Sequence, residues 1–230
     1  MKNIILSILT LVLFSTFSLA QCSKYYPFTK GASSTLTLYN DKAKVQGTIT
    51  YQVLNVSNTS EGEKANVSSS FKDEKGKEIT TTNYDATCKN GTVSIDFNSM
   101  LRPELMKAYG DMKVESEITG VNIDIPNNLS VGQKLKDAEM NIKMSMSGMN
   151  FNMSTLITER EVIGKETITT PAGTFVCYVI SQTTVSEGMA GSIKRSSKQW
   201  FAEGVGVIKT EDYDKKGKLD GYGILTAFSK

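Results

Sequence analysis

The sequence predicts an all-β protein in which a single antiparallel meander sheet makes up most of one domain. Three features support this prediction: apolar and polar residues alternate, β-branched residues are abundant where they alternate, and turn signals interrupt the pattern at short intervals. Alternation is clearest in residues 36–39, 48–56, 93–97 and 121–125. An apolar–polar alternation with a period of two residues is typical of strands that bury one face, and the spacing of the turns indicates roughly twelve to fourteen strands.

Residues 1–20 are expected to be a signal peptide. Lys2 provides a positive start, residues 4–17 are apolar, and Ser18 and Ala20 place small residues where a signal peptidase cuts. The apolar run is shorter than the ~20 residues that a helix needs to cross a bilayer, and no later stretch approaches that length. We therefore expect a single exported domain over 21–230, periplasmic or extracellular, without a transmembrane segment after cleavage.

Cys22 raises a second interpretation of the amino terminus, in which the chain is a lipoprotein. Leu19 stands three residues before Cys22, as lipid modification requires, but Gln21 occupies a position that takes a small side chain. Free export is therefore favoured over acyl anchoring through Cys22.

The cysteines after residue 20 are Cys22, Cys88 and Cys177. An oxidising compartment favours one disulfide and one spare thiol. Cys177 lies in the apolar run 174–180, which is typical of a strand buried on both faces, where a free thiol packs as a small hydrophobic group. Cys22 and Cys88 are thus the expected pair, although spacing alone leaves three unpaired thiols open.

A first hairpin is expected around Asn90–Gly91, a dipeptide typical of two-residue turns. This turn predicts a register with the apolar members on one face: Lys89 opposite Thr92, Cys88 opposite Val93, Ala86 opposite Ile95 and Tyr84 opposite Phe97.

One short helix is expected at about 99–110, after this hairpin. Leu101, Leu105 and Tyr109 have helical spacing, Pro103 lies in the first turn and Gly110 follows as a stop signal.

A second hairpin, turning at Ser147–Gly148, has a face that is rich in methionine. The turn predicts that Met146 opposes Met149, Met144 opposes Phe151, Ile142 opposes Met153 and Met140 opposes Thr155. The other face of both strands is polar, so the apolar residues of the two strands lie on one face of the hairpin.

This face has two interpretations, which the sequence leaves open. It is either the ordinary core side of a sheet or the lining of a groove whose flexible thioethers adapt to a lipid or another apolar ligand. The candidate ligand-binding residues, with the single tryptophan added, are Met140, Ile142, Met144, Met146, Met149, Phe151, Met153 and Trp200.

Composition excludes several function classes. The chain has no histidine, which removes histidine-based triads, acid–base relays and metal sites. A net charge of +2 is too small to attract a polyanion electrostatically, so nucleic acid is not expected as a partner. Nucleophile-elbow and phosphate-loop motifs are absent, and residues 212–217 indicate a charged turn rather than a calcium loop. No catalytic residue, metal or cofactor is predicted, while a hydrolase using dispersed carboxylates stays open.

Four segments resemble the TapB-like family of exported bacterial proteins of unknown function: 22–31, 125–132, 170–178 and 200–209. The Pro171-Ala172-Gly173 and Gly204-Val205-Gly206 pieces are also similar to a wider periplasmic group. The resemblance implies a strongly curved half-barrel like that of the Lol lipoprotein carriers, and it implies no catalytic residues.

These observations predict a non-enzymatic envelope protein whose half-barrel binds a lipid or another apolar small molecule. The alternative is a structural or interaction module whose partner is another envelope protein and which has no small-molecule ligand.

Overall fold

The computed structural model describes residues 22–100, 115–146, 149–188 and 191–230, and the statements below concern these residues. They form strands and one short 3-10 helix, with these bounds: β1 (Ser33–Asn40), β2 (Val45–Thr59), β3 (Gly62–Asp73), β4 (Glu78–Lys89), β5 (Thr92–Ile95), η1 (Phe97–Met100), β6 (Glu115–Val121), β7 (Ile123–Pro126), β8 (Ala138–Met146), β9 (Met149–Thr170), β10 (Gly173–Gly188), β11 (Gly191–Ala202), β12 (Gly206–Tyr213) and β13 (Leu219–Ser229). Within the described part of the chain, no helix is long and apolar enough to cross a membrane.

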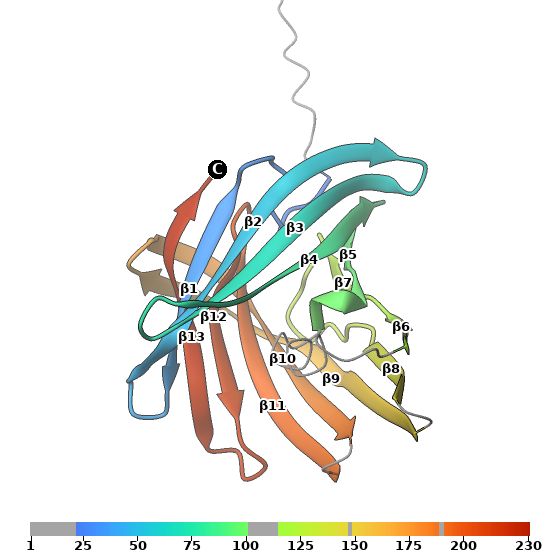
Figure 1. Cartoon of the computed structure of the whole chain (residues 1–230). Coiled ribbons are helices and arrows are strands. Elements are labelled where there is room, and N and C mark those ends of the chain that lie inside the picture. The colour runs from blue at the N-terminus through green and yellow to red at the C-terminus, as the bar shows by residue number, and fades with distance from the viewer. Residues whose placement is uncertain (1–21, 101–114, 147–148, 189–190) are drawn as a thin grey trace, which may run out of the picture.

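All 13 strands belong to one sheet, in the order β6-β8-β9-β10-β11-β12-β13-β1-β2-β3-β4-β5-β7 (Figure 1). Every strand pair is antiparallel, and the first strand, β1, pairs with the last, β13. The sheet thus consists of two meanders, β1–β5 and β8–β13, joined side by side, with β7 added at the edge of the first and β6 at the edge of the second. The predicted antiparallel all-β fold is confirmed.

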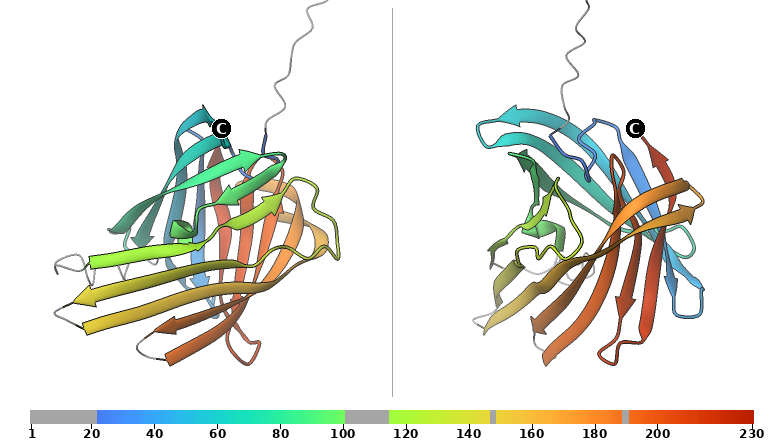
Figure 2. Two further views of the ribbon diagram at one scale, coloured as in Figure 1. Left: turned by 90° about the vertical axis from the view of Figure 1, so that its right-hand side faces the viewer. Right: turned by 180° about the vertical axis from the view of Figure 1, so that it is seen from behind.

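The sheet curls into a nearly closed barrel with one seam (Figure 2). Its two edge strands, β6 and β7, are separated in the chain by Asn122 alone, so the edges cannot lie far apart. The Asn122 side-chain oxygen accepts a hydrogen bond from the backbone N–H of Phe97 at 3.1 Å, which fixes this crossing. The predicted curvature is therefore strong enough to bring the sheet almost to closure.

Arg160 of β9 reinforces the seam from the other side. Its guanidinium donates to the backbone carbonyl of Asp124 on β7 at 3.1 Å and to that of Lys136, just before β8, at 2.6 Å. The side chain is buried, and burial lowers the pKa of this guanidinium from its usual value. Arginine remains charged inside proteins, and these carbonyls bind the terminal nitrogens of the buried cation, while its Nε has no hydrogen-bond partner among the described residues.

The apolar side chains form two main clusters on opposite faces of the sheet. On β11, Phe201 contributes to the cluster inside the barrel, whereas Trp200 and Ala202 belong to the other one. On β10, Ile180 joins the interior cluster and the free Cys177 joins the opposite one. The prediction that the run 174–180 is buried on both faces is confirmed only for its second half, where Cys177, Val179 and Ile180 are buried, because the Val176 side chain is 58% exposed.

The Asn90–Gly91 hairpin has the predicted register at three of four positions: Lys89 opposite Thr92, Cys88 opposite Val93, and Ala86 opposite Ile95. Both turn residues have positive φ, 52° and 74°, as a type I′ turn requires. The fourth predicted pair, Tyr84 with Phe97, is wrong. The ladder ends at Ile95 because the Asp96 side chain accepts the Asn98 N–H and starts η1.

The helix expected at 99–110 falls largely outside the described residues. Ser99 and Met100, its described start, belong to the 3-10 helix η1.

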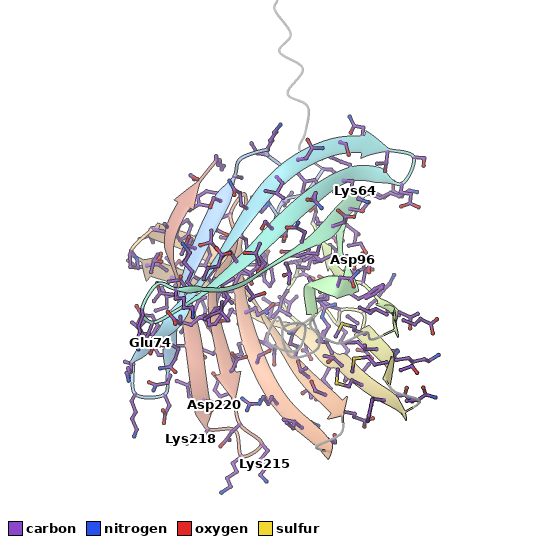
Figure 3. All side chains as sticks on the ribbon, in the orientation of Figure 1. Lys64, Glu74, Asp96, Lys215, Lys218 and Asp220 are labelled. Carbon is purple, nitrogen blue, oxygen red and sulfur yellow. A yellow bond between two sulfur atoms is a disulfide. The ribbon has the colours of Figure 1, made fainter. Side chains whose placement is uncertain are left out.

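Three hairpins of neighbouring strands share one turn structure. Asn40, Asp73 and Asp214 each accept, through side-chain Oδ1, the backbone N–H groups two and four residues later at 2.8–3.0 Å. The fourth residue of each turn has a positive φ: 57° at Ala43, 78° at Gly76 and 76° at Gly217. Asp214 is thus the first residue of a hairpin turn, as the charged-turn interpretation of residues 212–217 predicts. Figure 3 shows Glu74, Lys215 and Lys218 at the turns.

Ala43 and Gly217 provide a matched test of this turn. Gly217→Ala is expected to lower the free energy of unfolding by about 1 kcal/mol, because left-handed backbone costs a residue with a Cβ roughly 1–2 kcal/mol. The new methyl group would meet open space, so no clash adds to the effect. Ala43→Gly should leave stability unchanged or raise it. Urea unfolding of both variants checks this, and a loss in Ala43→Gly equal to that in Gly217→Ala would contradict it.

Candidate functional site

The methionine-rich hairpin has the register that the sequence predicts. Met140 pairs with Thr155, Ile142 with Met153, Met144 with Phe151, and Met146 with Met149. Met140, Ile142 and Met144 are buried, and Phe151 and Met153 pack against them while partly buried. The side chains of Met146 and Met149 lie outside the described residues.

This cluster is packed by the chain itself. Phe97 of η1 and Ile118 of β6 cover the buried methionines. The Phe97 ring lies directly on the backbone of Gly120, so closely that a Cβ added there would stand 2.7 Å from the ring. In the described part of the chain, the methionine face is therefore part of the core.

Trp200 does not join the methionine cluster. It is buried on the opposite face of the sheet, where its indole N–H donates to a Glu166 carboxylate oxygen at 2.9 Å. The Lys209 ammonium lies 4.5 Å from the centre of its ring, a cation–π contact. The structure thus brings the β8–β9 candidates together and separates Trp200 from them.

A cavity of about 210 Å³ lies elsewhere in the barrel interior. Its walls come from β1 to β5, β7, β11 and β12, with apolar side chains such as Val53, Ile125 and Phe201. Ser99 of η1 also lines it, so η1 lies between the cavity and the methionine cluster. None of the residues that the sequence singled out as ligand-binding lines this cavity.

The segment 22–32, here called the N-terminal roof, covers one end of the cavity with Tyr26, Pro27 and Ala32. The Cys22–Cys88 disulfide attaches its start to β4, which confirms the predicted pair. The backbone carbonyl of Lys24 accepts the Gly204 N–H at 2.6 Å, on the opposite side of the barrel.

Two further contacts fix the N-terminal roof. The Asn127 side chain receives the Lys24 N–H at 2.8 Å and donates to the Cys22 carbonyl at 2.6 Å. At the other end of the roof, the Gly31 N–H donates to the Val53 carbonyl of β2 at 2.9 Å. The roof is therefore attached to strands on both sides of the barrel.

Three tyrosines place hydroxyl groups in this largely apolar space, which serine and glutamine residues also line. Tyr26 from the roof and Tyr84 from β4 share a hydrogen bond of 2.5 Å between their hydroxyl oxygens, and Tyr51 of β2 lines the same cavity. Burial raises the pKa of all three above the ordinary value of 10.0. They are therefore neutral phenols, able to donate and accept hydrogen bonds throughout the physiological range.

Sequence reasoning missed these tyrosines and the roof. The available signal was the run Tyr25-Tyr26-Pro27 directly after Cys22, where a mature amino terminus would otherwise be polar and exposed. Once Cys22 is tied to an inward-pointing Cys88, the aromatic residues that follow must enter the barrel. Within the described ranges, no group of three or more cysteine or carboxylate side chains is arranged to hold a metal ion.

Comparison with known proteins returns a family and a fold. A family model described as DUF3108-like matches residues 29–225. No curated protein matches the sequence. The match to this family model supports the expected relationship to exported proteins of unknown function, while membership of the TapB-like family stays a prediction.

Two crystal structures match over the whole of their own chains and 91% of this one, each with a TM-score of 0.72. The first, from Bacteroides fragilis, is 21% identical and is described as a proposed exported protein with a YmcC-like fold. The second, from Parabacteroides distasonis, is 25% identical and is described as a proposed lipoprotein. These structures support the barrel fold, and their descriptions specify no ligand.

Loss of the disulfide should destabilise the protein. The Cys22→Ser/Cys88→Ser variant is expected to lose about 4 kcal/mol of unfolding free energy, because the bond closes a long loop in the unfolded chain. Urea unfolding measures this loss, and hydrogen exchange should show faster exchange at Gly31 and Gly204. An unfolding curve of the parent protein that does not change on adding reductant would contradict the prediction.

Alkaline pH should destabilise the fold through the buried tyrosines. Burial, followed by Glu203, raises the pKa of Tyr25 to about 12. Because unfolded tyrosines ionise near pH 10, stability should be constant up to that pH and fall between pH 10 and 12. Urea unfolding and tyrosinate absorbance across this range test the prediction. It fails if every tyrosine of the folded protein titrates near pH 10.

Proposed function

The chain belongs to the DUF3108-like family, and we propose that it is a non-enzymatic exported protein that binds a small apolar ligand inside its barrel. The observation that carries the proposal is the internal cavity beneath the N-terminal roof. The binding residues are those of the cavity wall, and the methionine cluster serves as the packed floor on the far side of η1.

The size of the cavity supports binding. Its 210 Å³ exceed the roughly 150 Å³ of an apolar protein cavity known to take up benzene. The space fits one ring with a small substituent or a short acyl chain.

The lining supports binding rather than acid–base catalysis. No acidic or basic side chain lines the cavity in the part of the chain that the structure describes. A glycosidase-type mechanism needs two carboxyl groups facing one cleft, and this wall presents only neutral groups.

The Cys22–Cys88 disulfide supports free export over acyl anchoring. Disulfides persist in oxidising compartments such as the periplasm. The Cys22 sulfur is bonded to that of Cys88, and one sulfur cannot also carry a lipid thioether. We therefore assign this chain to the exported proteins that are not lipidated at Cys22, in contrast to the description of its Parabacteroides relative.

Filling the cavity tests the proposal. Ser69 of β3 lines the cavity, so Ser69→Leu should occupy part of the space and abolish toluene binding with little loss of stability. Isothermal titration calorimetry of toluene with the parent and the variant measures this effect.

Ser68→Leu is the matched control, because the adjacent residue of a strand points to the other face of the sheet. It should bind toluene like the parent protein. A parent protein that binds no apolar probe would overturn the proposal and leave the structural interpretation of the barrel as the better one.

A further inference from the structure

Resting on the proposed function, we infer that the ligand is uncharged and presents an acceptor oxygen, such as a ketone, ester or ether, to the hydroxyls of Tyr26, Tyr51 and Tyr84. This inference specifies the chemical class of the ligand, which the cavity volume alone leaves open.

Two tyrosine hydroxyl protons of the cavity have no hydrogen-bond acceptor among the described residues, although Gln52 and Gln199 also line it. Tyr26 and Tyr84 form one hydrogen bond with each other, so one of their two protons is used and the other is not. The Tyr51 hydroxyl makes no hydrogen bond to any described residue. Two O–H donors are therefore available in one apolar space.

The Tyr51 hydroxyl keeps some exposure, because Arg160 Nε is the only fully buried polar side-chain atom without a partner among the described residues. Water can therefore bind this hydroxyl, and a ligand that displaces the water without accepting the proton loses a hydrogen bond. A carbonyl oxygen has two lone pairs and can accept both protons at once. The roof contributes Tyr26, so the acceptor would bind where the roof meets β2 and β4.

Charge on the ligand is disfavoured by the same wall. No cationic side chain lines the cavity among the residues described, and no carboxylate does either. Arg160 is buried in the barrel, but it is not part of the lining and its terminal nitrogens are bound to backbone carbonyls. A carboxylate or an ammonium would lose its hydration without gaining an ionic partner, which is far more costly than burying a neutral carbonyl.

Three probes of similar size test this inference on the disulfide-bonded protein: toluene, acetophenone and benzoate. Calorimetric titration should give acetophenone about 5–30-fold tighter binding than toluene, as one or two hydrogen bonds of ~1 kcal/mol predict, and benzoate the weakest binding. Tyr51→Phe should remove most of the preference for acetophenone and leave toluene affinity unchanged.

Tyr222→Phe is the control, since this tyrosine stacks on Tyr39 between β13 and β1 and does not line the cavity. Should Tyr51→Phe fail to fold, the double variant Tyr26→Phe/Tyr84→Phe provides the comparison, because it removes both hydroxyls of the bonded pair and with them the free proton.

The outcomes separate this inference from the proposed function. If none of the three probes binds, the proposed function itself is wrong. If toluene binds as tightly as acetophenone, or benzoate binds most tightly, the cavity binds ligands but the inference about their chemistry is overturned. An acetophenone preference that survives in Tyr51→Phe and in Tyr26→Phe/Tyr84→Phe also overturns it.

Discussion

Closure of the sheet across Asn122 is the constraint on which the rest of the structure depends. A sheet with this many strands normally twists open and leaves two exposed edges. Here the two edge strands follow each other in the chain, so the ends of the sheet must meet. Arg160 adds hydrogen bonds between β9 and the β7 side of the seam. Rolling the sheet in this way creates an interior that a flat sheet would not have.

The N-terminal roof covers one end of that interior. Without the segment 22–32, the end of the barrel would expose the apolar residues that Tyr25 and Phe28 now cover. The disulfide holds one end of the roof and backbone hydrogen bonds hold the other, so the tyrosine hydroxyls are presented at a fixed position. Stability and the proposed ligand recognition therefore depend on the same eleven-residue segment, 22–32, which also lies next to the predicted cleavage position.

Local patterns were enough to predict the strands, the registers of both hairpins near their turns, and the Cys22–Cys88 pair. The alternation of apolar and polar residues and the turn residues act over a few positions, and the pairing of Met144 with Phe151 follows from them directly.

The candidate site could not be predicted in the same way. An apolar face looks the same in sequence whether Phe97 covers it or a ligand does, and Phe97 comes from a distant element. The cavity depends on strands that meet only after the barrel closes, so Tyr26, Tyr51 and Tyr84 could not be grouped from sequence. The residue at which a strand ladder ends was not predicted either. The β4–β5 ladder, for example, ends at the Asp96 turn before η1.

The central claim is that the barrel encloses a ligand-sized apolar space beneath the N-terminal roof. A crystal structure of the protein determined under xenon pressure tests it most directly, because xenon enters apolar cavities without requiring any hydrogen bond. The account predicts xenon density between Val53, Ile125 and Phe201, below Tyr26. A diffraction map with no xenon at that position, and with the same side chains in mutual contact, would contradict it.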